Sequence, residues 1–144
     1  MSEALSFARL VYDAVDSMDE TKLAAFLTSD CTFVFGNATP IVGRAAAAEA
    51  SKAFLSLIAS IRHEIDDVWR VNDVIITRLT VTYTRKDSTS MTFPGVTIWR
   101  VKGERIADYR IYIDNTPLFT REANASPGAF EHSFSVSASS RQAV

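Results

Sequence analysis

The sequence predicts a single α+β domain, with helices in its first part and an antiparallel sheet after them. Up to residue 61, apolar side chains recur mostly at three- and four-residue spacing, whereas from residue 62 onward they recur at every second position. The chain of 144 residues has the length of about one domain. Its apolar content of 47% is enough for a core that needs neither disulfides nor a metal.

Three helices are expected before residue 62. The first covers about 5–18 and can begin at Ser2, because its apolar residues share one face of a helix. A second, short helix opens at Asp19, whose carboxylate can cap the free backbone N–H groups there. The third covers about 44–61, where five alanines precede a set of larger apolar residues.

One strand is expected before the third helix and four more after it. The early strand covers 31–35 and stops at Gly36-Asn37, before a loop marked by Pro40 and Gly43. Short turns rich in Asn, Asp, Ser and Gly separate the later strands. These strands lie near 62–71, 74–85, 91–101 and 106–114.

The last part of the chain differs in composition from the rest. Beyond residue 119 it is rich in Ser, Ala and single polar residues. We therefore expect a domain over 1–119 and a poorly ordered tail over 120–144. Phe130 and Phe134 are the tail residues that we expect to pack on a neighbour.

Charge and cysteine usage exclude several classes of protein. A formal net charge of -2, without any basic block, does not fit a nucleic-acid partner. No apolar stretch is long enough to span a membrane. Cys31 is the one cysteine, which excludes an internal disulfide and a zinc site of several thiolates. An acid and an arginine early in the chain do not fit a signal peptide, so we expect a cytoplasmic protein.

Four segments together resemble a known superfamily. They are FLTSDCTF at 26–33, GRAA at 43–46, GERI at 103–106 and ADYRIYID at 107–114. With the order of expected elements, they resemble the SnoaL-like and ketosteroid isomerase-like members of the nuclear transport factor 2-like superfamily, over roughly 4–119. The resemblance implies a cone-shaped, cystatin-like α+β barrel, in which three helices and a curved, mostly antiparallel sheet enclose an apolar pocket.

The catalytic sets of two relatives are missing at the matching positions. Resemblance to ketosteroid isomerase implies a tyrosine, a carboxylate base and a neutral acid, but Val11, Phe35 and Val96 stand there. Resemblance to limonene epoxide hydrolase implies an aspartate on the last strand, where this chain has Ile111. We therefore expect Phe35, Val96 and Ile111 to line a pocket that is more apolar than in those relatives.

Strand parity separates an inner from an outer face of the sheet. Tyr83 and Tyr109 share mostly apolar faces, so we expect them to line the pocket, with Tyr12 from the first helix. The opposite faces carry tryptophan, arginine and tyrosine side chains, a mixture that is typical of protein interfaces. These residues are Arg78, Trp99, Arg110 and Tyr112. We predict a homodimer through this outer face.

His63 is the candidate for acid/base chemistry, with Tyr109 as its helper. Histidine titrates near neutral pH, and the resemblance implies that this position lines the pocket. The alternatives are a histidine that only hydrogen-bonds a core tyrosine and a histidine at the rim of the sheet. Asp67 shares the parity of His63 but lies about 13 Å along an extended strand, so it cannot orient the ring. Asn37 either presents an amide at the pocket mouth or is a turn residue.

Three functions stay open at this point. The first is a cofactor-free isomerase, dehydratase, cyclase or hydrolase that acts on a small apolar metabolite by acid/base chemistry. The second is a module of the same fold that binds such a ligand without converting it. The third is a dimeric interaction module. The chain has no metal-ligand spacing, glycine-rich phosphate loop or serine-nucleophile motif, so we expect neither a metal nor a cofactor.

Overall fold

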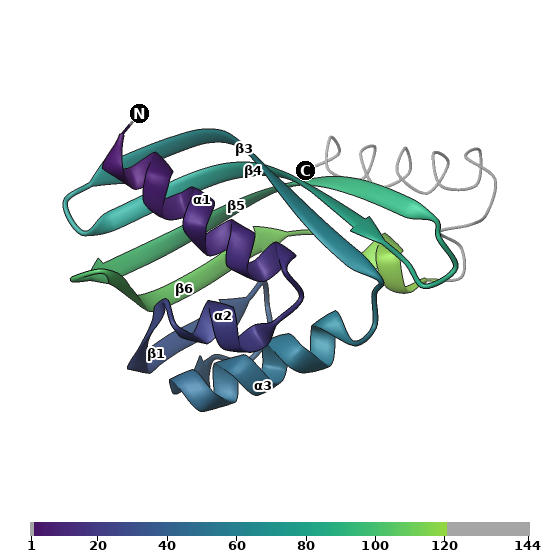
Figure 1. Ribbon diagram of the computed structural model, residues 1–144, viewed down its shortest axis with the longest axis horizontal. Coiled ribbons are helices and arrows are strands. Elements are labelled where there is room, and N and C mark those ends of the chain that lie inside the picture. Colours follow the sequence, from purple (N-terminus) through teal and green to yellow (C-terminus); the bar gives the residue numbers. More distant parts are fainter. Residues whose placement is uncertain (1, 121–144) are drawn as a thin grey trace, which may run out of the picture. The chain divides into compact units, whose positions relative to one another are not determined.

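The computed structural model describes residues 2–120 and confirms the predicted α+β fold (Figure 1). The helices are α1 (Glu3–Asp16), α2 (Glu20–Ala24) and α3 (Arg44–Leu55). The strands are β1 (Leu27–Phe35), β2 (Ile41–Val42), β3 (Ser60–Val71), β4 (Val74–Thr84), β5 (Ser90–Lys102) and β6 (Arg105–Ile113). A 3-10 helix, η1 (Thr116–Phe119), follows them.

The described residues fall into two units. The elements from α1 to β6 belong to a compact unit that ends at Asp114, and η1 belongs to a unit that begins at Asn115. The predicted tail over 120–144, with Phe130 and Phe134, lies outside the described residues except for Thr120. None of the helices described over 2–120 is long and apolar enough to cross a membrane.

The first two helices start where the sequence predicts caps. The Ser2 hydroxyl accepts a hydrogen bond from the backbone N–H of Leu5 at 3.0 Å. The Asp19 carboxylate accepts one from the backbone N–H of Thr21 at 2.9 Å. Both bonds satisfy N–H groups that have no partner inside their own helix.

The end of the third helix was predicted six residues too late. α3 ends at Leu55, and the segment near 61 belongs to β3 instead. Ser60 and Ile61 pair with Thr84 and Tyr83 of β4, so cross-strand hydrogen bonds replace the helical ones. Ile58 and Ile61 are buried although they lie beyond the helix, which is why helical spacing alone misplaced the boundary.

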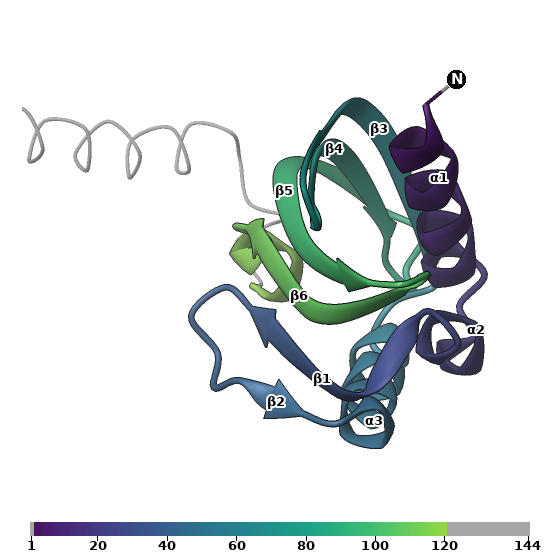
Figure 2. The ribbon, with the colours of Figure 1, turned by 90° about the vertical axis from the view of Figure 1, so that its left-hand side faces the viewer.

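The six strands form one mixed sheet in the order β2-β1-β6-β5-β4-β3. β1 pairs with β6 in parallel, and the other four pairings are antiparallel. The short β2 was not predicted, because its two residues lie in the segment read as a loop. Figure 2 shows β3 to β6 strongly curled, with α1 across their concave side and α2 and α3 next to β1. The predicted helix-covered, mostly antiparallel sheet is confirmed.

A bulge in β3 changes which residues share a face. His63 pairs with Val81 of β4, but the register shifts between Ile65 and Asp67. Asp67 therefore pairs with Arg78, and its carboxylate accepts a hydrogen bond from Arg78 Nε at 2.7 Å on the outer face. The expectation that Asp67 shares the parity of His63 is wrong, because one inserted residue reverses the alternation.

Burial alternates along β5 and identifies its two faces. Gly95, Thr97 and Trp99 are buried, whereas Val96 is half-buried and pairs with Arg78 and Tyr112. Val96 is therefore on the outer face, and its expected place on the pocket wall is wrong. Trp99 is fully buried on the inner face, so its expected place on the outer face is also wrong. Its large indole packs under α1, against Phe7 and Tyr12.

Candidate functional site

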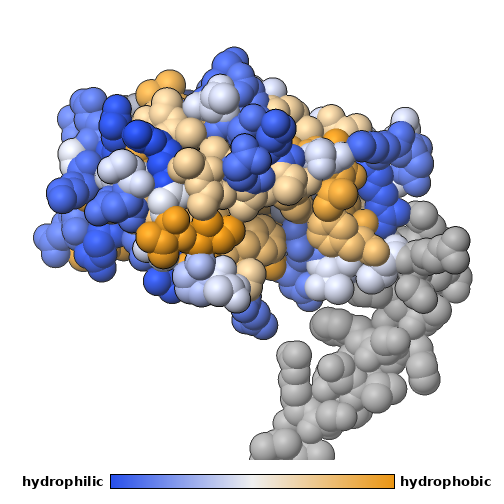
Figure 3. Space-filling view, turned by 90° about the horizontal axis from the view of Figure 1, so that it is seen from below, coloured by the Kyte–Doolittle hydropathy of each residue, from blue (hydrophilic) through white to orange (hydrophobic). Residues whose placement is uncertain are grey.

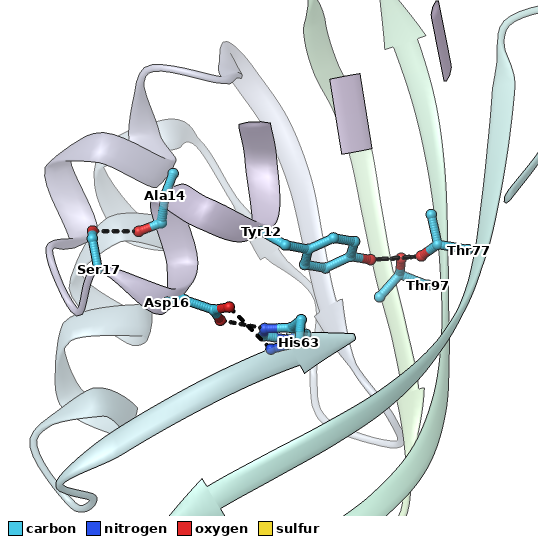
Figure 4. Close-up of polar contacts among 7 residues, drawn as sticks. All are labelled: Tyr12, Ala14, Asp16, Ser17, His63, Thr77 and Thr97. Atoms are coloured by element: carbon cyan, nitrogen blue, oxygen red, sulfur yellow. Dashed lines mark hydrogen bonds and ion pairs between the residues drawn. The ribbon is translucent and has the colours of Figure 1, made fainter. Parts of the chain in front are cut away.

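The inner face carries one histidine that is held by a carboxylate. His63 Nδ1 lies 2.6 Å from Asp16 Oδ1, and the His63 backbone N–H donates to Asp16 Oδ2 at 3.0 Å (Figure 4). The His63 side chain is 10% exposed and that of Asp16 21%. Since a carboxylate only accepts, the proton of the neutral ring stays on Nδ1 and the lone pair on Nε2. Asp16 thus fixes both the position and the tautomer of the imidazole.

Tyr12 covers one flat side of the same imidazole. The two ring centroids lie 4.6 Å apart with an angle of 24° between the planes, a stacked arrangement. Tyr12 and Asp16 are one turn apart on α1, so both side chains extend from the same side of the helix toward β3 (Figure 4). The imidazole is therefore held at one edge and on one face by a single helix.

The Tyr12 hydroxyl is bound at the centre of the sheet. It lies 2.6 Å from Thr77 Oγ1 of β4 and is also hydrogen-bonded to Thr97 of β5, and the two threonine hydroxyls bond to each other. Burial raises the pKa of Tyr12 above its ordinary value, although the hydrogen bonds from Thr77 and Thr97 act in the opposite direction. This hydroxyl stays protonated at neutral pH.

Tyr109 is deep in the core and not beside His63. Its ring contacts Trp99 at 5.5 Å and Phe33 at 5.0 Å between centroids, and Trp99 in turn lies against Tyr12 at 5.3 Å. Burial raises the pKa of Tyr109 well above its ordinary value. The structure thus places Tyr109 two ring contacts away from the tyrosine that touches His63. A direct helper role for Tyr109 has no contact to support it.

Tyr109 and four other inner-face residues are almost completely buried. We call them the sealed half, and each is at most 3% exposed. They are Ile75, Thr77, Thr97, Trp99 and Tyr109. In the register of the sheet they occupy two adjacent rows, beneath α1.

A second group on the inner face is only half covered. Phe35 and Ile111 pair across β1 and β6, and Phe93 and Ile113 lie further along β5 and β6. With Phe54 of α3, all of these are partly exposed, and we call them the open half. Tyr83 is buried next to them, with its ring 6.0 Å from Phe54 and 5.9 Å from Phe93. Phe35, Ile111 and Tyr83 are thus on the predicted side of the sheet.

His63 lies at the border of the two halves. On β3 it pairs with Val81, which pairs with Phe93 of the open half, about two strand spacings away. Its ring stacks on Tyr12, whose hydroxyl reaches into the sealed half. The arrangement places the imidazole in one row with the partly exposed Phe93, with the buried Val81 between them.

Asn37 is on an exposed turn after β1. Gly36 before it has a positive φ of 52°, and the Ala38 N–H donates to the Phe35 carbonyl at 2.9 Å. The turn alternative for Asn37 therefore has direct support, and no hydrogen bond joins its amide to another residue within 2–120. Asn37 is not brought to His63 by any contact in the described part of the chain.

Asp16 is the residue of the candidate site that sequence reasoning missed. Its spacing of four residues from Tyr12 was a usable signal, because both must share one side of α1. The pairing with His63, 47 residues away in the chain, depends on α1 lying beside β3. No local sequence pattern in α1 or β3 indicates this contact.

The outer face is polar and aromatic. Asp108 accepts a hydrogen bond from Arg110 Nε at 2.9 Å, so these two charges pair within β6. Tyr112 is 48% exposed and Trp69 49% exposed, and Trp69 pairs with Ile76 on the outer face. Trp69, and not Trp99, is thus the tryptophan exposed on the outer face. Figure 3 views the molecule from below, where apolar residues form separate groups between polar ones.

Metal-binding side chains are not grouped in the described chain. Over residues 2–120, no cluster of three or more His, Cys, Asp or Glu side chains could hold an ion. Cys31 is a buried free thiol, and burial raises its pKa. The titratable pair Asp16 and His63 is therefore the chemistry that the geometry offers on the inner face.

Three solved structures show what the fold is similar to. A hypothetical protein with a ketosteroid isomerase-like fold from Catenulispora acidiphila, in complex with trimethylamine, has a TM-score of 0.69 and 18% identity, covering 74% of this chain and 83% of that chain. An NTF2-like protein of unknown function from Burkholderia pseudomallei has a TM-score of 0.68 and 19% identity, covering 82% and 95%. An LEH-like epoxide hydrolase from M. tuberculosis has a TM-score of 0.67 and 18% identity, covering 78% and 83%. These likenesses concern the fold alone.

Sequence comparison gives the family. A search of curated proteins gave no match. The model of the SnoaL-like domain matches residues 8–109, which include most of α1, all of β1 and α3, and most of the sheet. Since this match spans most of the chain and the fold agrees with it, the chain belongs to the SnoaL-like family of the nuclear transport factor 2-like superfamily.

Proposed function

We propose that the chain is a cytoplasmic, cofactor-free acid/base catalyst that acts on a small apolar molecule. His63 is the proton carrier in this proposal, and Asp16 orients it. The distance of 2.6 Å between His63 Nδ1 and Asp16 Oδ1, at the border of the open half, is the observation that carries the proposal. The buried thiol of Cys31 suits a reducing compartment.

The proton transfer follows from the tautomer. With Nδ1–H donated to Asp16, the basic atom is Nε2, which has no protein hydrogen-bond partner within residues 2–120. Nε2 can take a proton from a carbon or oxygen of the substrate, and the Asp16 carboxylate stabilises the imidazolium that forms. Returning that proton to another atom gives an isomerisation, and giving it to a leaving hydroxyl gives a dehydration.

The substrate class follows from the surface next to His63. The open half offers phenylalanine and isoleucine side chains that are partly exposed, and the buried Tyr83 packs behind them. Such a surface favours a ligand with a flat or branched apolar body. The epoxide hydrolase among the similar structures belongs to the same fold, but Ile111 here cannot supply the aspartate that resemblance implies. For this reason the proposal rests on His63 and not on that relative's chemistry.

A generic carbon acid tests the proposal without knowledge of the substrate. In 5-nitrobenzisoxazole, a base takes the C3 proton, the N–O bond breaks, and a coloured cyanonitrophenolate forms. We expect the wild type to accelerate this reaction and His63→Ala to lose about 10²-fold of the rate. Asp16→Asn should lose about tenfold, because an amide stabilises the imidazolium less well. His132→Ala, at the chain's other histidine, is the matched control and should keep the rate.

Two results would count against this function. A His63→Ala protein that stays folded and retains the full rate would remove His63 from the mechanism. A wild type that binds the probe but is no faster than His63→Ala would favour the alternative, a ligand-binding module without turnover.

We also propose a homodimer through the outer face of the sheet. The exposed Trp69 and Tyr112 provide aromatic surface, and the pairs Asp67–Arg78 and Asp108–Arg110 leave the charges of this face balanced. A two-fold axis brings the same surface of both copies together, so a face with paired charges and exposed aromatics suits it. Trp69 replaces Trp99 as the tryptophan of this proposed contact.

Sedimentation velocity tests the dimer. We expect the wild type to sediment as a dimer and Trp69→Asp as a monomer. Leu10→Asp, which adds the same charge at an exposed apolar residue of α1, should stay dimeric. A monomeric wild type, or a dimeric Trp69→Asp protein, would contradict the proposal.

A further inference from the structure

We infer that Tyr12 is a positioning residue for His63, and that Thr77 and Thr97 fix Tyr12 for this purpose. The inference rests on the proposed function, since it describes how the proton carrier is held. It changes the sequence-based expectation for Tyr12, which was contact with the ligand. Three observations lead to it: the stacked rings, the closed set of hydroxyl hydrogen bonds, and the common origin of Tyr12 and Asp16 on α1.

The imidazole is restrained in two directions by one helix. Asp16 holds the Nδ1 edge and the backbone N–H of His63, which sets where the ring lies. A carboxylate contact at one edge still allows the ring to rotate about the line joining the two groups. Tyr12, stacked at 4.6 Å and 24°, opposes this rotation and so sets the direction of Nε2. Proton transfer depends strongly on that direction.

The hydroxyl groups of Tyr12, Thr77 and Thr97 bond one another and form a closed triangle. Each hydroxyl has one proton to donate, and three mutual bonds use all three protons. The Tyr12 hydroxyl therefore has no proton left for a ligand. Because Thr77 is on β4 and Thr97 on β5, the triangle ties the far end of the Tyr12 ring to two strands of the sheet.

A purely structural use of the triangle is the competing explanation. Three mutually bonded hydroxyl groups in an apolar core add little stability over apolar side chains of the same shape, so stability alone does not require them. A core that needed only volume could use phenylalanine and valine at these positions. Holding the Tyr12 ring against His63 is the use that we infer for them.

The experiment uses the full chain carrying His132→Ala, so that His63 is its one histidine. Every imidazole signal in a nitrogen-15 NMR spectrum then comes from His63. In this background we compare Tyr12→Leu, Tyr12→Phe, the double variant Thr77→Val/Thr97→Val, and Phe7→Leu. Phe7 is also on α1, but its ring contacts Phe26 and Trp99, so it controls for general loosening of the helix.

The ring signals are the first readout, because they do not depend on turnover. In the parent we expect one tautomer with a proton on Nδ1 that exchanges slowly with water. Tyr12→Leu should give about tenfold faster exchange and a mixture of tautomers, whereas Tyr12→Phe keeps the ring but loses its hydroxyl anchor and should give about threefold faster exchange. The double threonine variant removes the same bonds and should match Tyr12→Phe, and Phe7→Leu should match the parent.

Turnover of 5-nitrobenzisoxazole is the second readout. We expect Tyr12→Leu to lower kcat about tenfold while KM changes by less than about twofold, since the ring is misaligned but the open half is intact. Parent-like ring signals in folded Tyr12→Leu protein would overturn the inference, and so would a Phe7→Leu variant with the same changes as Tyr12→Leu. If the parent shows no turnover, the proposed function fails while the ring signals still decide the positioning role.

Discussion

The sealed half and the open half of the inner face share one sheet but differ in cover and in chemistry. The sealed half is at most 3% exposed and contains two threonines and a tyrosine, which are fixed by hydrogen bonds or ring contacts. The open half is apolar, partly exposed and carried by β1, β5, β6 and α3. Polar groups are thus buried where they can satisfy one another, and apolar groups are left where solvent or a ligand can reach them.

The difference indicates a division of work within the inner face. A rigid, completely covered core is suited to holding a side chain in one orientation, because close-packed groups cannot shift independently. A partly covered apolar surface is suited to receiving a molecule. His63 has a link to each half. Its ring stacks on Tyr12, whose hydroxyl is bound in the sealed half, and it pairs through Val81 with Phe93 of the open half.

The largest expected effect is in the sealed half. Trp99→Ala should lower the free energy of unfolding by about 3–5 kcal/mol, because it removes a fully buried indole that packs against Phe7, Tyr12 and Tyr109. Phe93→Ala in the open half should cost about 1–2 kcal/mol less, since solvent already reaches that ring. Urea unfolding followed by circular dichroism measures both. Equal losses would show that the two halves do not differ in packing.

The second largest expected effect is a loss of folding stability at alkaline pH, caused by the buried Tyr12 and Tyr109. Burial raises the pKa of Tyr12 and Tyr109 in the folded chain above the value of about 10 in an unfolded chain. Above pH 10 the unfolded chain releases these protons and the folded chain keeps them, so stability is full below pH 10 and falls as pH rises. Each tyrosine contributes a decrease of at most about 1.4 kcal/mol per pH unit.

Phenylalanine substitutions identify the source of that decrease. Urea unfolding between pH 9 and 11 should show a smaller loss for Tyr12→Phe and for Tyr109→Phe than for the wild type, and the smallest loss for the double variant. A double variant with the wild-type pH dependence would assign the decrease to other groups.

Much of the fold could be predicted because its signals are local. Short segments are enough to identify the caps at Ser2 and Asp19 and the change of apolar period. These signals predicted helices and strands close to the observed ones. The end of α3 and the two residues of β2 were misplaced because pairing with distant strands decides them. Parity reasoning succeeded for β4, where the alternation is unbroken, and for Tyr109, Ile111 and Ile113 of β6, which follow the register shift between β5 and β6.

The candidate site was predictable only in part. His63 and Tyr12 could be proposed from residue type and position, but their partners come from other elements. The contact with Asp16 and the threonine triangle each join segments far apart in the chain. The face of Val96 was misassigned from the resemblance and that of Trp99 from its residue chemistry, and in both cases the alternation of β5 gives the opposite answer. A side chain that looks suited to an interface can equally well be core.

A substitution at Gly95, near the border between the halves, should have a smaller effect on the free energy of unfolding. A Cβ at Gly95 would lie 3.3 Å from Ile113 Cβ and Cδ1, so the side chain of Ile113 rests directly over the glycine. Gly95→Ala should cost about 1–2 kcal/mol of unfolding free energy, since crowding outweighs the reduced freedom of the unfolded chain. Ile113→Val removes one of the crowded atoms, so the double variant should be more stable than the sum of the single changes predicts. Strict additivity in urea unfolding would mean that Ile113 moves away freely.

The smallest expected effect on stability is at Phe35 in the open half. Phe35→Leu should change the free energy of unfolding by less than about 1 kcal/mol, because the ring is partly exposed and has one tilted contact, with Phe54 at 6.2 Å. If the open half receives the ligand, the same change should raise KM for 5-nitrobenzisoxazole about threefold and leave kcat within about twofold, since His63 and its partners are untouched. Thr82→Val, on the outer face of β4, is the control and should alter neither constant. An unchanged KM in Phe35→Leu, combined with a loss of stability as large as that of Trp99→Ala, would reverse the assignment and make this side of the sheet a structural core.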